Sequence, residues 1–344
     1  MTAWYINKGP ESDVILSSRV RIARNIAGYP FPYRMDKTEG NEVLQKASEA
    51  VMKSNIAKGL IFIDTRKLSP VERQSLVEKH LVSPDLVNSN NEHGVIISKD
   101  ENISIMINEE DHIRIQCMVP GMQMDKALNE CDRIDNLIEK KIDYAFNKDF
   151  GYLTSCPTNV GTGIRASVMM HLPALVMTGY IKGILEACGK IGIAVRGIYG
   201  ENSEASGNMF QISNQVTLGQ TEKEIVANIT NIASQVIEQE RMLRSEFYKQ
   251  NPYRFEDKIY RSLGVLSNAR VISTDESLRL LSDVRLGVDM GIIKDIKIES
   301  LNEIILYLQP ANLQRLSDRP LTPEERDVQR AELIRTKLGM AKAE

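Results

Sequence analysis

The sequence predicts an α+β body, residues 1–252, followed by a mostly helical domain, residues 253–344. Segments with the alternating pattern of β-strands recur as far as residues 207–219, and the β signal fades beyond Pro252. Segments with helical spacing separate these strands and make up most of the remainder. With 344 residues, 42% of them hydrophobic, the chain can form one large domain and a smaller one.

The first half of the chain predicts strands and two helices. Residues 12–25, "SDVILSSRVRIARN", predict a strand, because side chains alternate between its two faces. Residues 42–55 have the spacing of an amphipathic helix. Residues 94–119 predict a hairpin of two strands around the turn "KDEN", and residues 124–147 predict one long helix. In the first strand one face carries Ser17, Arg19 and Arg21, and the other carries Leu16, Val20 and Ile22.

The second half begins with the loop "CPTNVGTGIRASV", residues 156–168. We expect a helix to start at Ile164, behind the glycines of this loop, and to end near Pro173. Residues 189–200 and 207–219 predict strands. Three helices are expected to begin with capping boxes. These capping boxes are Thr221 with Glu224, Ser273 with Glu276, and Thr322 with Glu325, the last followed by Pro323 at the first helical position.

Composition excludes several classes of protein. A net charge of −3 leaves no basic footprint for non-specific nucleic-acid binding. The four cysteines form no C-x-x-C pair, so we expect free thiols in a reducing compartment, without a zinc site or disulfides. The N-terminal residues resemble no signal peptide, and no apolar run approaches the length of a membrane span. The sequence therefore predicts a cytoplasmic protein without membrane or nucleic-acid partners.

Five arginines lie where separate segments could converge: Arg19, Arg21, Arg114, Arg165 and Arg196. Arginine suits phosphate, because its planar fork donates two parallel hydrogen bonds and always carries charge. If the segments converge, the cluster forms a polyphosphate clamp. The sequence has no P-loop motif and no protein-kinase motif set. It also shows no acidic pair spaced to hold a metal, so any Mg²⁺ is expected to arrive on a nucleotide.

Taken alone, the same residues also fit ordinary roles. If "INEEDHIRI" is a strand, Glu110, His112 and Arg114 share one face, which could simply be solvated and self-neutralising. Cys156 could be a small buried hydrophobic residue, as most free cysteines are. A cysteine hydrolase would need a histidine beside that thiol, and His112 and His171 are the nearest candidates.

Five blocks of sequence occur in the order typical of one family. The blocks "SSRVRIARN", "INEEDHIRI", "GYLTSCPTNVGTGIRASV", "VRGIYGENSE" and "ISNQVTLG" resemble the signatures of the phosphagen kinases. That family moves the γ-phosphoryl of ATP to a guanidinium, on a glutamine-synthetase-like fold with a largely antiparallel sheet flanked by helices. The resemblance implies that Cys156 lies beside the acceptor, that Glu110 orients it and takes its proton, and that Glu204 is a second acceptor-binding carboxylate.

The resemblance also implies a set of ATP-binding residues from these blocks, together with the histidine of "EKHLVSP". They are Ser17, Ser18, Arg19, Val20, Arg21, His80, Arg114, Arg165, Ala166, Ser167, Val168, Met169, Arg196, Gly197, Ile198, Tyr199, Gly200 and Glu201. Tyr199 stands where arginine kinases have a further phosphate-binding arginine, which weakens the transfer of that loop's role.

Two features resemble the bacterial branch of this family that phosphorylates arginine side chains of proteins. No helical domain of the kind that covers a small guanidino substrate precedes Ser17, and an extra tail follows residue 252. The tail contains "RDVQRA", which resembles the phosphoarginine-binding regulatory motif of that branch, with Arg326, Asp327, Arg330 and Ala331 as binding residues. The alternative is a surface helix with charges paired at i,i+4.

The sequence thus predicts an ATP-dependent protein-arginine kinase. The resemblance implies bacterial stress-response partners: a transcriptional repressor as substrate, a zinc-binding activator protein, and a Clp-type unfoldase–protease that receives marked proteins. It also implies a homodimer or larger oligomer, with dimerisation and allosteric regulation through the tail. Two alternatives remain. One is a non-catalytic adaptor that binds phosphoarginine, and the other is a guanidino kinase acting on free arginine.

Overall fold

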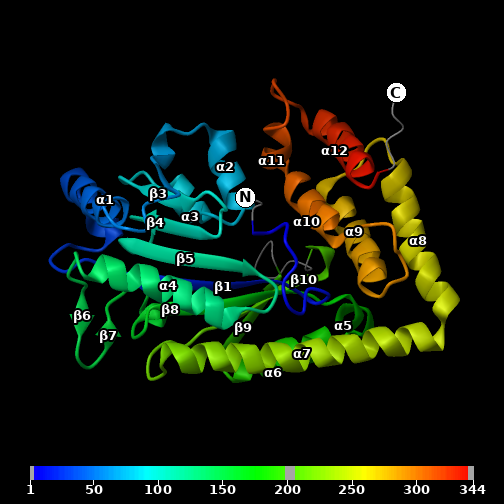
Figure 1. The fold of residues 1–344 in the computed structure, drawn as a ribbon, viewed down its shortest axis with the longest axis horizontal. Helices are drawn as coiled ribbons and strands as arrows, with labels where there is room; N and C mark the ends of the chain where they lie inside the picture. Colours follow the sequence, from blue (N-terminus) through cyan, green and yellow to red (C-terminus); the bar gives the residue numbers. More distant parts are fainter. Residues whose placement is uncertain (1–3, 198–205, 340–344) are drawn as a thin grey trace.

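A computed structural model describes residues 4–197 and 206–339. Within them lies an eight-stranded antiparallel sheet with the order β2-β3-β4-β5-β1-β8-β10-β9 (Figure 1). Its strands are β1 (Ile15–Arg24), β2 (Leu60–Ile63), β3 (Gly94–Ser98), β4 (Ile103–Ile107), β5 (Ile113–Pro120), β8 (Ile164–His171), β9 (Ile193–Gly197) and β10 (Met209–Asn214). A separate short hairpin is formed by β6 (Phe146–Asn147) and β7 (Gly151–Tyr152).

Helices flank this sheet and make up the end of the chain. The first seven are α1 (Lys37–Met52), α2 (Pro70–Glu78), α3 (Pro84–Asn88), α4 (Met124–Glu139), α5 (Pro173–Thr178), α6 (Ile181–Lys190) and α7 (Glu222–Gln250). The tail contains α8 (Pro252–Asn268), α9 (Thr274–Asp289), α10 (Ile298–Tyr307), α11 (Pro310–Gln314) and α12 (Pro323–Lys337). The predicted fold class, an antiparallel sheet with flanking helices and a helical C-terminal region, is confirmed.

Capping explains where the predicted helices begin. In α7, Thr221 and Glu224 form both bonds of the capping box, and in α12 Thr322 and Glu325 do the same. Ser273 accepts the backbone N–H of Glu276 at the start of α9. The helix predicted over residues 42–55 corresponds to α1.

The helix predicted from Ile164 is wrong, because this segment forms the strand β8. Its side chains alternate: those at 164, 166, 168 and 170 are buried in the core, whereas Arg165 and Met169 lie on the opposite face. The glycines before Ile164 serve close backbone approaches. Gly163 has φ +66°, and a Cβ there would lie 2.6 Å from the carbonyl oxygen of Ala23. No helix start is therefore available beside Arg165.

Three other expectations need correction. The segment after "KDEN" is broken by a turn at 108–112, so Glu110 and His112 do not share a strand face with Arg114. The long helix stops at Glu139, well short of residue 147. A bulge in β1 between Ile15 and Ser17 shifts the register, and Leu16 consequently lies outside the core that contains Val20 and Ile22.

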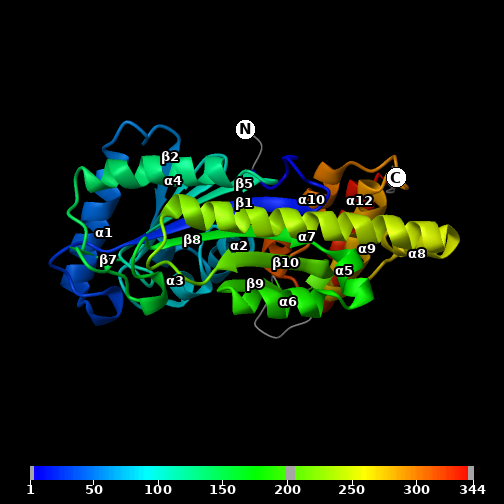
Figure 2. The ribbon, with the colours of Figure 1, turned by 90° about the horizontal axis from the view of Figure 1, so that it is seen from below.

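The two faces of the sheet differ in chemistry. One face is apolar and packs against α4 and α7, which lie along it (Figures 1 and 2). The other face carries the alternate residues of β5, β1, β8, β10 and β9, and these are largely polar. The tail has its own hydrophobic core, built from α8 to α12. A third, smaller cluster joins α2 and α3 to β3, β4 and β5 and includes Trp4 and Met118. The polar face thus lies beside this smaller cluster and opposite the main core of the sheet.

A buried ion pair holds the end of β1 against α4 and the loop before β8. The Arg24 guanidinium donates to Asp135 Oδ2 from Nε at 3.0 Å and from Nη2 at 2.7 Å. Its Nη1 donates to the carbonyl of Thr162 at 2.8 Å, and the Tyr152 ring lies 3.5 Å from its central carbon. Arg24 therefore fixes both sides of the loop that contains Cys156.

We expect Asp135→Ala to destabilise the protein by about 3–5 kcal/mol, because removing one partner leaves a buried charge without compensation. Urea denaturation would measure the change. Asn136→Ala, an exposed position on the same helix, should change the free energy of unfolding by less than about 0.5 kcal/mol. A loss below about 1 kcal/mol for Asp135→Ala would contradict the role assigned to the pair.

Candidate functional site: an arginine-lined sheet face

The strand register brings the predicted arginines onto the polar face. Arg21 of β1 lies directly opposite Arg165 of β8, and Arg19 lies opposite Ser167. Arg196 of β9 lies opposite Gln211 of β10. Arg114 projects from β5, the neighbour of β1 on the other side. Four strands thus bring five guanidinium groups to one surface.

The electrostatics show how close these guanidinium groups are. Burial lowers the pKa of Arg21 well below its usual range, and Arg19, Arg114 and Arg165 lower it further. Burial and the charge of Arg114 lower the pKa of Arg19 to about 10. For Arg165, burial lowers the pKa first and Arg196 adds to the effect. The face is therefore a concentrated positive site that would be stabilised by a bound anion.

Polar side chains orient these guanidinium groups. Arg19 donates to Gln211 Oε1 at 2.6 Å and to Ser167 Oγ at 3.4 Å. Arg165 donates to the carbonyl of Asn214 at 3.0 Å and to Asn159 Oδ1 at 3.1 Å. The buried Nε of Arg21 has no hydrogen-bond partner among the described residues. Such an unpaired donor can bond an incoming acceptor.

Two carboxylates of the 108–112 turn bind Arg114. Glu109 is buried and accepts Arg114 Nη1 at 2.7 Å, while Ser83 Oγ donates to the same carboxylate oxygen at 2.5 Å. Glu110 accepts Arg114 Nη2 at 2.9 Å, and 41% of its side chain is exposed. Burial raises the pKa of Glu110, and Arg114 opposes that rise. The exposed carboxylate of Glu110 is available to a further cation.

Asp111 links the Glu110 turn to the Cys156 loop. Its Oδ1 accepts Asn25 Nδ2 at 2.7 Å and the backbone N–H of Ser155 at 2.7 Å. Cys156 follows directly, partly exposed, with its Sγ 3.0 Å from Thr158 Oγ1. Burial raises the pKa of Asp111. Through Asp111, the structure brings Glu110 and Cys156 to the same edge of the arginine-lined face.

The two histidines considered for a cysteine hydrolase are engaged elsewhere. His112 Nδ1 accepts the backbone N–H of Ile26 at 2.9 Å, so its Nε2–H donates to the carbonyl of Pro30 at 2.8 Å. His171 Nε2 lies 2.7 Å from Ser282 Oγ. Neither ring is hydrogen-bonded to the thiol of Cys156, so neither histidine is placed to serve as the base of a cysteine hydrolase.

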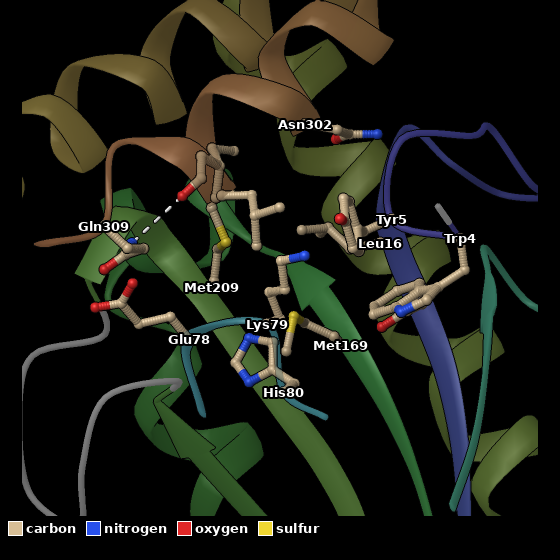
Figure 3. Close-up of a pocket in the computed structure, with 13 residues that line it drawn as sticks. Trp4, Tyr5, Leu16, Glu78, Lys79, His80, Met169, Met209, Asn302 and Gln309 are labelled. Atoms are coloured by element: carbon tan, nitrogen blue, oxygen red, sulfur yellow. Dashed lines mark hydrogen bonds between the residues drawn. The ribbon is translucent and has the colours of Figure 1, made fainter. Parts of the chain in front are cut away.

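Figure 3 shows an apolar pocket, which adjoins the arginine-lined face through a smaller cavity. Its wall includes Trp4 and Leu16 from the N-terminal part, His80 after α2, and Met169 from β8. A small cavity beside it shares Trp4, His80 and Met169, and it also reaches Arg19. An apolar pocket that opens onto a cationic surface suits a molecule with a flat apolar base and an anionic end.

The remaining predicted ATP-binding residues do not all lie at the arginine-lined face. Ser17 and Ser167 line the small cavity. Ser18 is buried and donates to the carbonyl of Gly121 at 2.8 Å. Val20, Ala166 and Val168 are buried in the core on the opposite face, and Gly197 ends β9. Ile198, Tyr199, Gly200, Glu201 and Glu204 lie outside the described residues.

The tail motif "RDVQRA" lies in the first turns of α12. Arg330 is buried: its Nε donates to the carbonyl of Leu308 at 2.9 Å, and its Nη1 donates to the carbonyl of Ile272 at 2.9 Å and to Asp327. Arg326 is half-buried and donates to the carbonyl of Leu321 at 2.8 Å. Ala331 is buried, as the Arg330 side chain is. Arg330 therefore has a structural role, because it joins α12 to the segments before α9 and after α10.

Sequence reasoning missed several residues of this site. Glu109 and Asp111 position their neighbours, Gln211 lines the small cavity, and Trp4 lines both that cavity and the apolar pocket. Glu109 and Asp111 are the sequence neighbours of Glu110, so the sequence alone could have indicated that they lie near the site. Nothing in the sequence marks Gln211 or Trp4, because their roles depend on contacts between distant segments.

Two negative findings apply to residues 4–197 and 206–339. They contain no group of three or more His, Cys, Asp or Glu side chains that could hold a metal ion. None of the helices in these ranges is both long and apolar enough to span a membrane.

Comparison with known proteins gives two family matches. The family described as "ATP:guanido phosphotransferase, C-terminal catalytic domain" matches residues 42–243. The family described as "Protein-arginine kinase McsB C-terminal domain" matches residues 252–344. The chain is 50% identical over 340 residues to a Halothermothrix orenii protein named protein-arginine kinase, covering 99% of this chain and 97% of the relative. It is also 50% identical over 342 residues to the Bacillus subtilis protein of that name, covering 99% and 94%.

Solved structures share the fold. Lombricine kinase aligns with a TM-score of 0.62 at 24% identity, covering 71% of this chain and 70% of that one. The duplicated taurocyamine kinase from Schistosoma mansoni, with bound components of a transition state analog, aligns with a TM-score of 0.62 at 28% identity. That alignment covers 72% of this chain and 37% of the duplicated one.

We expect the free energy of unfolding to fall as pH is lowered from about 6.5 toward 4. Burial lowers the pKa of His80 to about 4, with the charge of Arg19 adding to the effect, and burial also lowers that of His112 to about 4. In this window the unfolded chain binds protons that the folded protein does not. Each histidine therefore lowers the free energy of unfolding by about 1.4 kcal/mol for each pH unit by which the pH falls.

Urea denaturation at pH 7, 6 and 5 would measure this dependence. His80→Asn should reduce the slope, because asparagine tolerates the left-handed backbone conformation of this position, φ 58°, and does not titrate. An identical slope in the variant would show that His80 is not buried in its neutral form.

Proposed function

The chain belongs to the ATP:guanido phosphotransferase family, and we propose from this premise that it is an ATP-dependent protein-arginine kinase. The proposed reaction moves the γ-phosphoryl of ATP to the guanidinium of an arginine side chain on a protein. One observation carries the proposal. Five guanidinium groups meet on one sheet face, and the exposed carboxylate of Glu110 lies at their edge. The face suits a polyphosphate, and the carboxylate suits a guanidinium.

The nucleotide would be held by complementary charge and shape. The phosphates would lie on Arg19, Arg21, Arg114, Arg165 and Arg196, which neutralise the charge spread over the transferring group. The base would enter the adjoining apolar pocket. Mg²⁺, which reduces phosphate charge when bound, is proposed to come with ATP, since the described residues offer no carboxylate cluster to hold it.

Glu110 would orient the acceptor and receive its proton. In the reaction a bond forms between the acceptor nitrogen and the γ-phosphorus, the bond from phosphorus to the leaving oxygen of ADP breaks, and the proton of the nitrogen passes to Glu110. A free guanidinium has a pKa above about 12, so its proton is costly to remove early. In a loose transition state the bond to the attacking nitrogen is only slightly formed. The nitrogen can therefore lose its proton late in the reaction. The raised pKa of Glu110 makes its carboxylate a better base.

The openness of the site supports a protein side chain as acceptor. Glu110 and Cys156 are both accessible from solvent at the edge of the arginine-lined face. A side chain carried by a protein can reach such an edge. Cys156 is proposed to lie beside the acceptor, and the contribution of Glu204 stays part of this proposal.

We further propose that residues 1–252 form the catalytic unit and residues 253–344 a unit for dimerisation and regulation. "RDVQRA" would bind phosphoarginine, the product of the reaction, and thereby bias activity or association between subunits. The proposal includes a cytoplasmic location and a stress-response setting. Its protein partners would be a repressor as substrate, a zinc-binding activator, and a Clp-type unfoldase–protease.

Two alternatives predict different reactions. A non-catalytic adaptor would bind phosphoarginine without turnover, yet it would not need five arginines and Glu110 assembled on one face. A kinase for free arginine would keep the chemistry and phosphorylate a small molecule. Incubation with ATP and an unfolded protein, and in parallel with ATP and free arginine, followed by mass spectrometry at neutral pH, would separate all three. Phosphoarginine on the protein supports the proposal, and its absence while free arginine is phosphorylated contradicts it.

We expect Glu110→Gln to slow transfer by about 10²–10⁴-fold while ADP still binds. The amide keeps the size of the side chain but can neither accept the proton nor pair with the acceptor charge. Steady-state kinetics and calorimetric ADP titration would measure the two effects. The control Glu130→Gln alters an exposed carboxylate on α4 that pairs with Arg133, and it should leave both unchanged. A loss of only a few-fold for Glu110→Gln would exclude it as the base.

We expect Arg326→Ala to weaken the binding of free phosphoarginine and to abolish its effect on activity or oligomer mass. Arg326 is the informative position, because replacing Arg330 would also remove its bonds to two backbone carbonyls. Calorimetry, kinase assays and light scattering would follow the three properties. The control is Arg261→Ala, an exposed position on α8. Unaltered phosphoarginine binding in Arg326→Ala would reduce "RDVQRA" to a structural segment.

A further inference from the structure

The end of α2 holds His80 in an unusual backbone conformation. His80 follows α2 with φ 58°, in the left-handed region that favours glycine. Its N–H donates to the carbonyl of Val77 at 2.8 Å, and the N–H of Leu81 donates to the carbonyl of Leu76 at 3.0 Å. This closure of a helix end usually uses glycine. A histidine is kept in that conformation only where the surroundings hold it firmly.

The surroundings include a carboxylate two residues earlier. Glu78 accepts the backbone N–H of Ala311 at 2.8 Å and that of Asn312 at 2.7 Å. These two groups lie in the first turn of α11, which starts at Pro310, and first-turn N–H groups have no partner within their own helix. Burial raises the pKa of Glu78, and the two N–H bonds counteract that rise. The last residue of α2 is thus bound to the tail.

A second contact joins the same two helices. Ser75, which is buried one turn before Glu78, donates from its Oγ to Asn312 Oδ1 at 2.6 Å. Arg315 Nη1 donates to Ser75 Oγ at 3.0 Å. Two turns of α2 are therefore attached to α11 by side chains.

The tail residues just before α11 reach the apolar pocket. Asn302 and Gln309, from α10 and the residues that follow it, line the same pocket as His80 (Figure 3). The carbonyl of Leu308 in this connection accepts Arg330 of "RDVQRA" at 2.9 Å. Glu78 itself lines this pocket beside His80. Its bonds to α11 therefore join the pocket wall to the part of the tail that binds Arg330.

We propose that Glu78 is a positioning residue for nucleotide binding, because its bonds to α11 hold the end of α2 and so fix this part of the pocket wall, His80 included. The inference rests on the proposed nucleotide site. Glu78 does not itself contact the reacting atoms. Its partner is the backbone of the tail, so the tail contributes to nucleotide affinity through this contact.

Glu78→Gln tests the proposal, because an amide of the same size loses the charge and faces two N–H donors with only one acceptor oxygen. Trp4 is the only tryptophan of the chain and lines the same pocket as His80, so its fluorescence should report ADP titration. We expect the dissociation constant for ADP and the KM for ATP to rise at least about fivefold. The kcat at saturating ATP should change less than about twofold, because Glu110 and the arginine-lined face are untouched.

Asp257→Asn, at an exposed ion pair of α8, is the matched control and should bind ADP like the unaltered protein. Ser75→Ala is a second variant in case Glu78→Gln does not fold, and it should weaken ADP binding in the same direction by about two- to threefold. Unchanged ADP affinity in a folded Glu78→Gln or Ser75→Ala variant would overturn the inference and leave the kinase proposal intact. If the unaltered protein neither binds ADP nor transfers phosphate, the kinase proposal itself fails, and the inference fails with it.

Discussion

Mutual repulsion among guanidinium groups is the constraint on which the site depends. Burial and the charges of neighbouring guanidinium groups lower the pKa of Arg19, Arg21 and Arg165 on this sheet face, and such a cluster opposes folding. The rest of the structure counters this cost. Glu109 is buried against Arg114, while backbone carbonyls and amide oxygens orient Arg19 and Arg165. The repulsion that remains favours binding of a polyanion.

The antiparallel sheet explains why distant arginines could be predicted to converge. Side chains alternate along a strand, so Arg19 and Arg21 had to share a face once residues 12–25 formed a strand. The register that places Arg165 opposite Arg21 was not predictable, because pairing between distant segments leaves no local signal. Arg165 was expected at a helix start, since glycines precede it and Pro173 follows. The alternation of apolar residues from Ile164 onward was the better signal.

The turn at 108–112 shows a second limit of sequence patterns. Glu110, His112 and Arg114 have strand spacing, yet the chain turns at 108–112, and His112 bonds backbone atoms away from the site. The buried carboxylate of Asp111 explains why a turn is useful here, because it ties this segment to the loop of Cys156. Capped helices in the tail were predictable because capping is local. The contacts of the tail with the body connect residues far apart in the sequence and were not.

The tail meets the body beside the arginine-lined face on two sides. On one side α11 binds Glu78 and Ser75 of α2. On the other side α9 packs against Gly207, where a Cβ would lie 3.0 Å from the carbonyl oxygen of Leu278, and Ser282 Oγ accepts Asn208 Nδ2 at 2.8 Å. These contacts lie next to the pocket and at the start of β10, not on the apolar face of the sheet. A change in the tail can therefore reach the polar face through short bonded paths, without repacking the hydrophobic core that a rigid catalytic face requires.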